Sequence, residues 1–278
     1  MVTREDSEQG RRKVLTPTAV AAAADELALP TIKANRLAGA ATDRILAFKP
    51  DLGVIVAYGG LIREPLLSAP RLGWINLHFS LLPRWRGAAP VQRALMAGEE
   101  ITGASVFQLV EALDAGPVFG QLTQSIGKDE TAGELLDSLS IAGAELLLRV
   151  VDSIADGTAR AVEQDGDLTL APKLGIEDGR IRWSEHASTV TDLIRGVTPE
   201  PGAFTTIDDA RLKILRATIA SGIPPIEPGR LELVDGRVVA GTGSTPVELV
   251  TVHPAGKKAM NAADWWRGRP AGAGVVAG

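Results

Sequence analysis

The chain has 278 residues, with 45% hydrophobic and 23% charged side chains, a formal net charge of −5 and no cysteine. This length can bury one large core or two ordinary ones, and the lack of cysteine excludes disulfides, thiolate metal sites and cysteine nucleophiles. The apolar runs are far shorter than the ~18 residues of a membrane span, and the first residues carry no secretory signal pattern, so we expect a soluble cytoplasmic protein that does not bind membranes.

Helix-like and strand-like segments alternate through the first half of the chain. Residues 18–29 are rich in alanine and end at Pro30, which predicts a helix. Residues 52–57 form an apolar, β-branched run that is typical of a strand buried on both faces of a parallel sheet. Further elements are expected in the same alternating manner: strands at 74–78, 104–109 and 118–125, and helices at 88–96 and 131–154. The alternation predicts an α/β layered fold.

After residue 172 the pattern changes to short strand-like stretches between Gly, Pro and Asp turns. One helix is expected at 187–195, with Ser184 and Glu185 as its capping residues. The expected strands are 181–183, 203–207, 211–219, 230–234, 237–241 and 247–252. Many short strands at close spacing predict a small β-barrel or sandwich. We therefore divide the chain into a domain at 1–172, a linker at 173–178 and a β-rich domain at 179–278, of which residues 271–278 are expected to be disordered.

Polar residues interrupt the apolar strand predicted at 74–78. Asn76 and His78 are two residues apart, so they face the same side of the strand, near its C-terminal end, where open parallel sheets bind ligands. Asp114 lies in a separate turn beside Gly116 and Pro117. An imidazole moves protons near neutral pH, a nearby carboxylate raises its pKa, and a side-chain amide stabilises an oxyanion. These groups suit acyl transfer to an amine without a covalent enzyme intermediate.

The same residues also have a purely structural interpretation. A lone histidine in an apolar strand is more often a hydrogen-bonded core residue, and an aspartate beside a Gly-Pro turn more often bonds its own backbone. Spacing alone cannot join Asn76, His78 and Asp114 into one site, so both interpretations stand at this point. A histidine-rich metal centre is not expected, because His186 and His253 lie far from His78 in the sequence.

Several motifs together resemble the folate-dependent formyltransferase family. They are Asn76-x-His78, the run Ser80-Leu81-Leu82-Pro83-Arg84-Trp85-Arg86-Gly87-Ala88-Ala89-Pro90, and Leu113-Asp114-Ala115-Gly116. The likeness covers nearly the whole chain, and residues 254–260 resemble the branch of the family that acts on initiator methionyl-tRNA. The resemblance implies a Rossmann-like formyltransferase domain followed by a small β-barrel that is similar to an OB-fold and binds tRNA.

The resemblance also implies roles for individual residues. Asn76, His78 and Asp114 match the catalytic residues of the family, and a formyl group is expected to pass from 10-formyltetrahydrofolate to the free amino group of initiator methionyl-tRNA. In this reaction Asn76 and protonated His78 stabilise the oxyanion, and Asp114 supports the charged imidazole. No metal is needed, and we expect a monomer. The segment that binds the folate co-substrate matches four consecutive residues: Ser80, Leu81, Leu82 and Pro83.

Two basic segments bear on the tRNA partner. Arg11, Arg12 and Lys13 resemble part of a family loop that reaches the tRNA acceptor end, and Lys257 and Lys258 follow a glycine in a turn suited to phosphate contact. The alternative is solvated surface charge, which is the commoner meaning of such clusters. Phosphate contacts of this kind set the affinity for tRNA rather than the choice of tRNA.

The beginning of the sequence departs from the family pattern. Family members begin with a strand, a Gly-Thr-Pro-like turn, a helix and a second strand, whereas this sequence opens at the loop after that second strand. We interpret the sequence as N-terminally short and expect a sheet that lacks its first strands and exposes unpaired backbone edges. Ala115, where the family often has threonine, is expected to be tolerated.

Two other functions compete with transfer to methionyl-tRNA. One is a folate-dependent formyltransferase that acts on a sugar nucleotide or a purine precursor, which the segment at 254–260 and the predicted barrel disfavour. The other is a catalytically inactive folate- or tRNA-binding remnant, which the intact Asn76, His78 and Asp114 disfavour. Formyl transfer assays with charged tRNA and with small amines separate the three.

Overall fold

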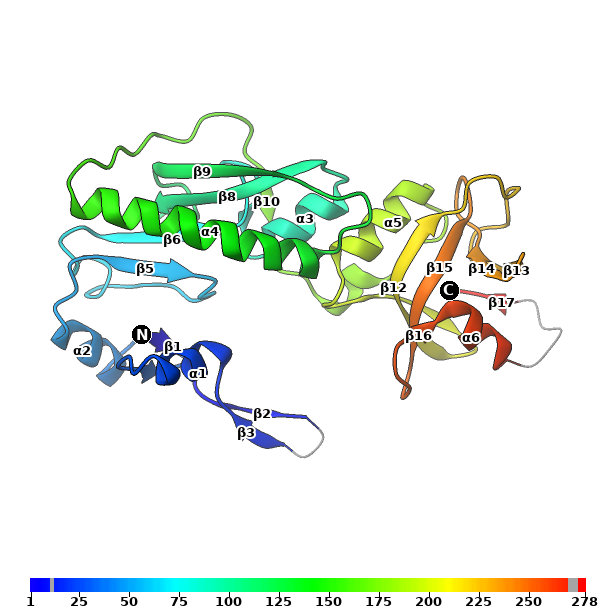
Figure 1. Cartoon of the computed structure of the whole chain (residues 1–278), viewed down its shortest axis with the longest axis horizontal. Helices are drawn as coiled ribbons and strands as arrows, with labels where there is room; N and C mark the ends of the chain where they lie inside the picture. The colour runs from blue at the N-terminus through cyan, green and yellow to red at the C-terminus, as the bar shows by residue number, and fades with distance from the viewer. Residues whose placement is uncertain (11–12, 270–274) are drawn as a thin grey trace.

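The structure is a computed structural model that describes residues 1–10, 13–269 and 275–278. An α/β part formed by the first half of the chain and a β-rich part formed by the last third lie end to end along the long axis of the molecule (Figure 1). No helix in the described ranges is both long and apolar enough to cross a membrane.

A four-stranded sheet forms the centre of the α/β part. Its order is β5 (Gly53–Val56), β6 (Trp74–His78), β8 (Ile101–Gln108) and β9 (Val118–Ser125). The β5–β6 pair is parallel, but β8 runs antiparallel to both β6 and β9, so the sheet is mixed rather than wholly parallel. The long helix α4 (Ala132–Ala155) runs along one face of this sheet (Figure 1).

The expectation that residues 52–57 form a strand buried on both faces is wrong. The strand itself forms, but the side chains of Val54 and Val56 are 44% and 46% exposed. In the described part of the chain β5 has β6 as its single sheet neighbour, so it is an edge strand. An apolar run therefore identified the strand but not its place in the sheet.

Alternate side chains of β6 pack into the apolar core between the sheet and α4. Ile75 and Leu77 pack with Leu146 and Val150 of α4 in one apolar cluster. Because side chains alternate across a strand, the residues between and after them, Asn76 and His78, point to the opposite face.

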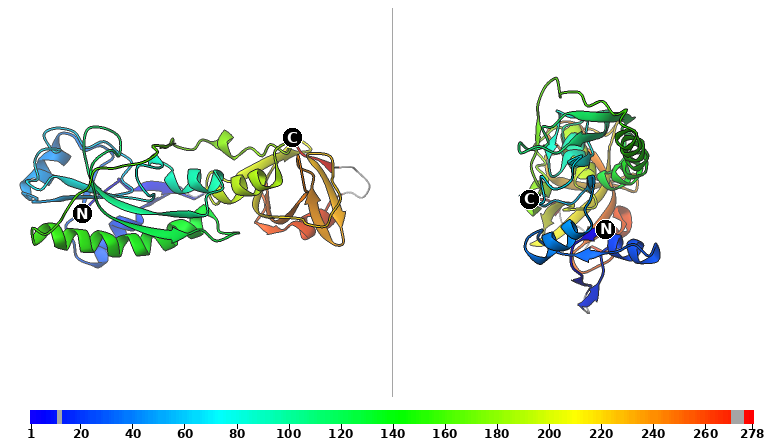
Figure 2. Two further views of the ribbon diagram at one scale, coloured as in Figure 1. Left: turned by 90° about the horizontal axis from the view of Figure 1, so that it is seen from above. Right: turned by 90° about the vertical axis from the view of Figure 1, so that its left-hand side faces the viewer.

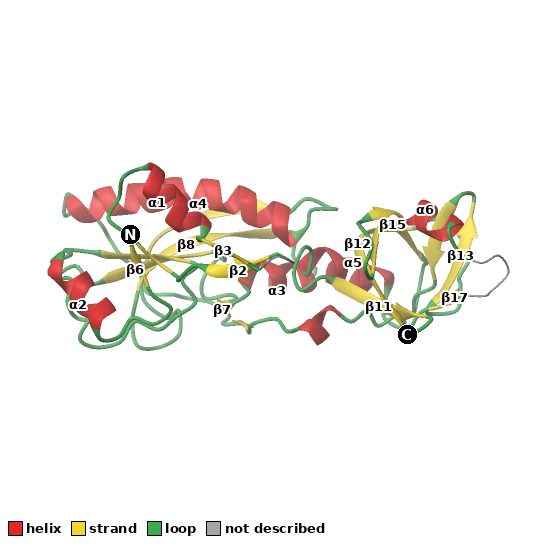
Figure 3. Cartoon of the chain, turned by 90° about the horizontal axis from the view of Figure 1, so that it is seen from below, coloured by secondary structure: helices red, strands yellow, loops and turns green. Residues whose placement is uncertain are grey.

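Shorter elements precede this sheet. Strands β1 (Val2–Thr3) and β4 (Ile32–Lys33) form a separate parallel pair, and β2 (Ser7–Gln9) and β3 (Val14–Thr16) form a hairpin. Helix α1 (Ala19–Glu26) begins at Thr18, whose hydroxyl caps it. Helix α2 (Ala40–Ala47) lies at the end of the molecule farthest from the β-rich part (Figure 3).

Helix α4 begins with a reciprocal cap. The hydroxyl of Thr131 accepts a hydrogen bond from the backbone N–H of Glu134, and the Glu134 carboxylate accepts one from the backbone N–H of Thr131 at 2.8 Å. These bonds satisfy N–H groups that the first helical turn otherwise leaves unpaired.

We expect Thr131→Ala to lower the free energy of unfolding by about 1 kcal/mol, because it removes the capping oxygen. Urea unfolding followed by circular dichroism measures the change. The control, Thr131→Ser, keeps a hydroxyl and should stay close to the unmodified chain. Equal losses in the two variants would show that the hydroxyl is not the source of the effect.

The β-rich part is an antiparallel sheet that closes on itself. Strands β11, β12, β15, β14, β13 and β17 follow one another, and β16 pairs with β15. The backbone of Gly278, just after β17, exchanges two hydrogen bonds with Thr206 of β11, so the last strand region returns to the first. The strands are β11 (Ala203–Ile207), β12 (Ala210–Ile219), β13 (Arg230–Val234), β14 (Arg237–Ala240), β15 (Val247–Pro254), β16 (Met260–Asn261) and β17 (Val275–Val276).

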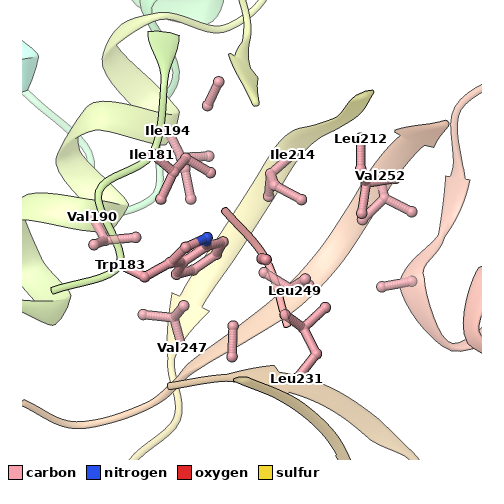
Figure 4. Packing of buried hydrophobic residues seen from close by; sticks show 14 of the residues in the cluster. Ile181, Trp183, Val190, Ile194, Leu212, Ile214, Leu231, Val247, Leu249 and Val252 are labelled. Atoms are coloured by element: carbon pink, nitrogen blue, oxygen red, sulfur yellow. The ribbon is translucent and has the colours of Figure 1, made fainter. Parts of the chain in front are cut away.

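One apolar cluster fills the interior of this closed sheet (Figure 4). Trp183 lies within it, 5% exposed, and its indole N–H donates to the Thr205 hydroxyl at 3.0 Å. The two further tryptophans near the end of the chain, Trp265 and Trp266, pack against the same cluster from helix α6 (Ala262–Arg267). The short strands predicted for the last third of the chain therefore form a closed barrel around one apolar core.

Four local expectations for this part are corrected. Residues 181–183 are not a strand, although Arg180 makes an isolated bridge to β11. Helix α5 (Ala187–Gly196) is capped by His186, rather than by Ser184 or Glu185, because the His186 ring accepts from the backbone N–H of Ser188. Helix α6 was not expected. Residues 275–276 pair with β13 instead of being disordered, and residues 271–274 lie outside the described ranges.

Helices α3 (Pro90–Met96) and α5 join the two parts (Figure 2). They pack closely at Gly196, where an added Cβ would lie 2.7 Å from Met96 Cγ and 3.0 Å from the Gln92 carbonyl oxygen. Met96 also packs against the barrel core. The 3₁₀ turn η1 (Ile176–Gly179) is fixed to α3 by an ion pair of 3.1 Å between Arg93 and Asp178.

Candidate active site

Strand β6 places Asn76 and His78 on the face of the sheet opposite to α4. The His78 side chain is 6% exposed and lies with its ring edge-on to Phe107 of β8, at 6.4 Å between ring centres. Phe107 is also the residue paired with Asn76 across the two strands. The two predicted site residues on this strand are therefore neighbours on one face.

The loop after β8 brings Asp114 to His78. Asp114 Oδ2 lies 3.8 Å from His78 Nδ1 and accepts a hydrogen bond of 2.8 Å from the backbone N–H of Gly87. Asp114 has a φ of 45°, a left-handed conformation that aspartate adopts more readily than most residues. The structure thus brings the predicted imidazole and carboxylate together from segments that are 36 residues apart in the chain.

Gln164 holds the Asp114 loop in place. Its Nε2 donates to the carbonyl oxygens of Asp114 and Gly116, both at 2.8 Å, and its Oε1 accepts from the Arg86 guanidinium. No sequence pattern marks Gln164 as a functional residue, because it lies in a polar stretch after α4. Its role is visible only where three distant segments meet.

The Asn76 amide has an incomplete set of hydrogen bonds. Its Oδ1 is buried and has no hydrogen-bond partner among the described residues. Buried polar atoms are paired in the great majority of cases, and a lone exception beside an imidazole and a carboxylate indicates a place where a ligand donates. Asn76 is therefore suited to contact a bound molecule rather than to hold the fold.

A backbone carbonyl fixes the proton of the neutral His78 ring. His78 Nε2 lies 2.8 Å from the Trp85 carbonyl oxygen, which can only accept, so Nε2 carries the hydrogen. Nδ1 is then free to accept a proton on the side of Asp114. Burial lowers the pKa of His78 below its usual value, and the Asp114 carboxylate and the Trp85 carbonyl offset only part of this effect.

As expected, the Asp114 carboxylate by itself raises the pKa of His78. The net shift is nevertheless downward, because desolvation of the ring is the larger effect. Asp114→Asn should therefore lower the pKa of His78 further, since it removes the opposing charge and leaves the burial. An NMR titration of the His78 ring measures the shift. Asp43→Asn, at an exposed position on α2, is the control. A rise in the pKa of His78 in the Asp114 variant would contradict this account.

The predicted folate-binding residues form the turn directly after β6. The Ser80 hydroxyl, 1% exposed, donates to the Arg84 carbonyl oxygen at 2.6 Å. Ser105 of β8 donates to the Ser80 carbonyl and accepts from the Leu82 N–H, and Gln121 of β9 donates to the Leu82 carbonyl. Leu81 is half-buried, and Leu82 and Pro83 are buried. The turn thus has a fixed shape next to His78.

The predicted tRNA-binding residues are not part of this cluster. Arg11 and Arg12 lie outside the described residues, and Lys13 is exposed at the end of the β2–β3 hairpin, 3.6 Å from Glu8. Lys257 and Lys258 are exposed in the turn between β15 and β16. In the view of Figure 1, this turn and the hairpin both project from the lower side of the molecule.

Family comparisons cover both parts of the chain. Residues 1–151 match the family described as "Formyl transferase", and residues 173–270 match "Formyl transferase, C-terminal domain". A protein named methionyl-tRNA formyltransferase from Clavibacter sepedonicus is 60% identical over 96% of this chain and 88% of its own length. One of the same name from Leifsonia xyli subsp. xyli is 57% identical over the same shares of the two chains.

Solved structures share the fold at low sequence identity. The methionyl-tRNA formyltransferase from Clostridium thermocellum aligns with a TM-score of 0.59 at 16% identity, covering 80% of this chain and 94% of that one. HypX from Aquifex aeolicus, solved with tetrahydrofolic acid, aligns with a TM-score of 0.61 at 20% identity, covering 80% of this chain and 39% of that one. At these identities the likeness concerns the fold.

Proposed function

This chain belongs to the methionyl-tRNA formyltransferase branch of the formyl transferase family, and on that basis we propose that it transfers the formyl group of 10-formyltetrahydrofolate to the free amino group of initiator methionyl-tRNA. The family uses a formyl donor derived from folate, and the proposal specifies the donor, the acceptor and the residues that act. Charged tRNA is present in the cytoplasm, which is where we place the reaction.

The proposed chemistry uses the three groups at the end of β6 and in the Asp114 loop. The methionyl amine attacks the formyl carbon, and the Asn76 amide donates a hydrogen bond to the oxygen that becomes negative. His78 is neutral at the start, because its pKa is lowered by burial, and its free Nδ1 takes the proton from the attacking nitrogen. The tetrahedral intermediate then collapses, its bond to the folate nitrogen breaks, and that nitrogen receives the proton.

Asp114 acts on the charged form of His78. A carboxylate 3.8 Å from Nδ1 stabilises the imidazolium that forms once the proton is taken up, and the imidazolium in turn stabilises the oxyanion. The expected participation of protonated His78 therefore applies to the intermediate and not to the free enzyme. Formylmethionyl-tRNA and tetrahydrofolate are the two products.

The remaining predicted residues have binding roles in this proposal. The folate co-substrate binds against the fixed turn next to His78, which is formed by Ser80, Leu81, Leu82 and Pro83. Arg11, Arg12, Lys13, Lys257 and Lys258 contact tRNA phosphates. Residues 1–172 act as the catalytic domain, 173–178 as the linker and 179–278 as the tRNA-binding barrel of a monomer that needs no metal.

The observation that carries the proposal is the close approach of His78 and Asp114, with the buried, unpaired Oδ1 of Asn76 on the same face of β6 as His78. The test is to incubate the protein with 10-formyltetrahydrofolate and methionyl-tRNA and to follow formylmethionyl-tRNA by acid gel electrophoresis. Formyl transfer to the charged tRNA supports the proposal. Transfer only to small amines or amino sugars, or folate binding without turnover, would replace it with one of the two competing functions.

A further inference from the structure

Trp85 has an unusual backbone conformation for a bulky residue. Its φ is 60°, in the left-handed region that residues other than Gly, Asn and Asp rarely adopt. This conformation is what turns its carbonyl oxygen toward His78 Nε2, at 2.8 Å. Strained backbone of this kind persists only where surrounding contacts impose it, so the contacts of Trp85 show what maintains the carbonyl in position.

Two side chains from distant segments bind Trp85 at opposite ends. The backbone N–H of Trp85 donates to the Thr169 hydroxyl at 2.8 Å, and the indole N–H donates to Glu99 Oε1 at 3.0 Å. Glu99 also pairs with Arg84, whose guanidinium lies 6.0 Å from the centre of the Trp85 ring. The Glu99 side chain is 18% exposed, so its hydrogen bond with the Trp85 indole is largely shielded from solvent.

The chain on both sides of Trp85 is fixed as well. The Arg84 carbonyl accepts from the Ser80 hydroxyl, and β7 (Arg86–Gly87) pairs in parallel with β10 (Leu170–Ala171), directly after Thr169. The Arg86 N–H donates to the Thr169 carbonyl at 2.9 Å. Thr169 therefore contacts the backbone of Trp85 and of the residue that follows it.

We propose that Glu99 and Thr169 are positioning residues that hold Trp85 in its left-handed conformation, so that its carbonyl keeps the hydrogen of neutral His78 on Nε2 and leaves Nδ1 free. The inference rests on the proposed function, because it assigns Nδ1 as the proton acceptor of the reaction. Neither residue touches the reacting atoms. Each acts through Trp85, on the tautomer and orientation of the imidazole.

The test compares a double variant that removes both acceptors with one that keeps them. Glu99→Met with Thr169→Val preserves approximate size but offers the two Trp85 N–H groups no oxygen acceptor, whereas Glu99→Gln with Thr169→Ser retains an oxygen at each position. Glu100→Gln, at the adjacent exposed residue, is the control for a change of charge. Thermal unfolding confirms that each protein is folded before measurement.

The direct readout is the His78 tautomer, obtained from the ring ¹⁵N chemical shifts of ¹⁵N-histidine-labelled protein at a pH where the ring is neutral. We expect the Nε2–H form alone in the unmodified chain and in the conservative double variant, and a mixture of tautomers in Glu99→Met/Thr169→Val. In the latter, kcat for formyl transfer should fall by about 10²-fold, with little change in KM for methionyl-tRNA.

An unchanged tautomer in Glu99→Met/Thr169→Val, or equal losses of kcat in the two double variants, would overturn the inference. The proposed function fails in a different way, through the lack of formyl transfer by the unmodified chain. Because the tautomer is measured without substrate, the two failures are distinguishable.

Discussion

Replacement of His78 by alanine is expected to lower kcat for formyl transfer by about 10²–10⁴-fold, the range typical of a lost general base. Affinity for methionyl-tRNA should change little, because the His78 ring is buried and distant in the chain from the basic residues proposed to contact phosphate. Steady-state formylation at saturating substrate measures kcat, and filter binding measures the affinity for methionyl-tRNA. Equal losses in turnover and in tRNA affinity would indicate a structural role for His78.

A second variant removes the concern that alanine leaves a cavity. Glutamine at position 78 can still donate to the Trp85 carbonyl oxygen but does not titrate near neutral pH, so His78→Gln should keep the fold and lose the proton transfer. His186→Asn is the matched control, because it removes an imidazole while an asparagine still caps α5. We expect the control to retain the kcat of the unmodified chain.

Replacement of Asn76 is expected to have the next largest effect. Asn76→Ala and Asn76→Asp should each lower kcat by about 10²–10³-fold, the loss measured for a single oxyanion donor in other enzymes. Aspartate has the same shape as asparagine but replaces the donor with an anion, so it separates the hydrogen bond from the shape of the side chain. More than half of the original kcat in Asn76→Asp would contradict the assignment.

The free energy of unfolding of the Asn76 variants tests the assignment independently of kcat. Asn76 Oδ1 is buried without a partner among the described residues, and an unpaired buried polar atom costs about 1–3 kcal/mol. Asn76→Ala removes that atom, so its free energy of unfolding should fall less than is usual for a truncation in a strand. Asn35→Ala, which loses surface hydrogen bonds to Glu5, is the control for activity and should retain kcat. Loss of both kcat and fold in Asn76→Ala would assign the residue to the structure.

Much of the fold was predictable from the order of residues, because local patterns carry it. The strand at 74–78, the strand at 118–125 and the helix that follows Thr131 were identified closely. Their signals are apolar periodicity and a capping residue, which act over a few neighbours in the chain. The expectations failed where burial depends on the position of a strand in the sheet. Val54 and Val56 are exposed because they lie on an edge strand.

The candidate site divides in the same way. Asn76 and His78 were placed on one face by the two-residue period of a strand, and this is confirmed by the packing of Ile75 and Leu77 on the other face. The proximity of Asp114 to His78 followed only from the family resemblance, since spacing gives no measure of distance across a loop. The roles of Gln164 and Thr169 are not predictable from local patterns, because their contacts span 50 and 84 residues of chain, respectively.

The sequence by itself determined the kinds of chemical group present, the period of each strand and helix, and the family to which the chain belongs. The tertiary structure decided the state of those groups. The pKa of His78 moves downward because burial of the ring lowers it by more than the Asp114 carboxylate raises it. The tautomer of the ring is set by the Trp85 carbonyl, which side chains from two distant segments hold in place. Desolvation and hydrogen-bond direction depend on what surrounds an atom in space, which no local pattern along the chain records.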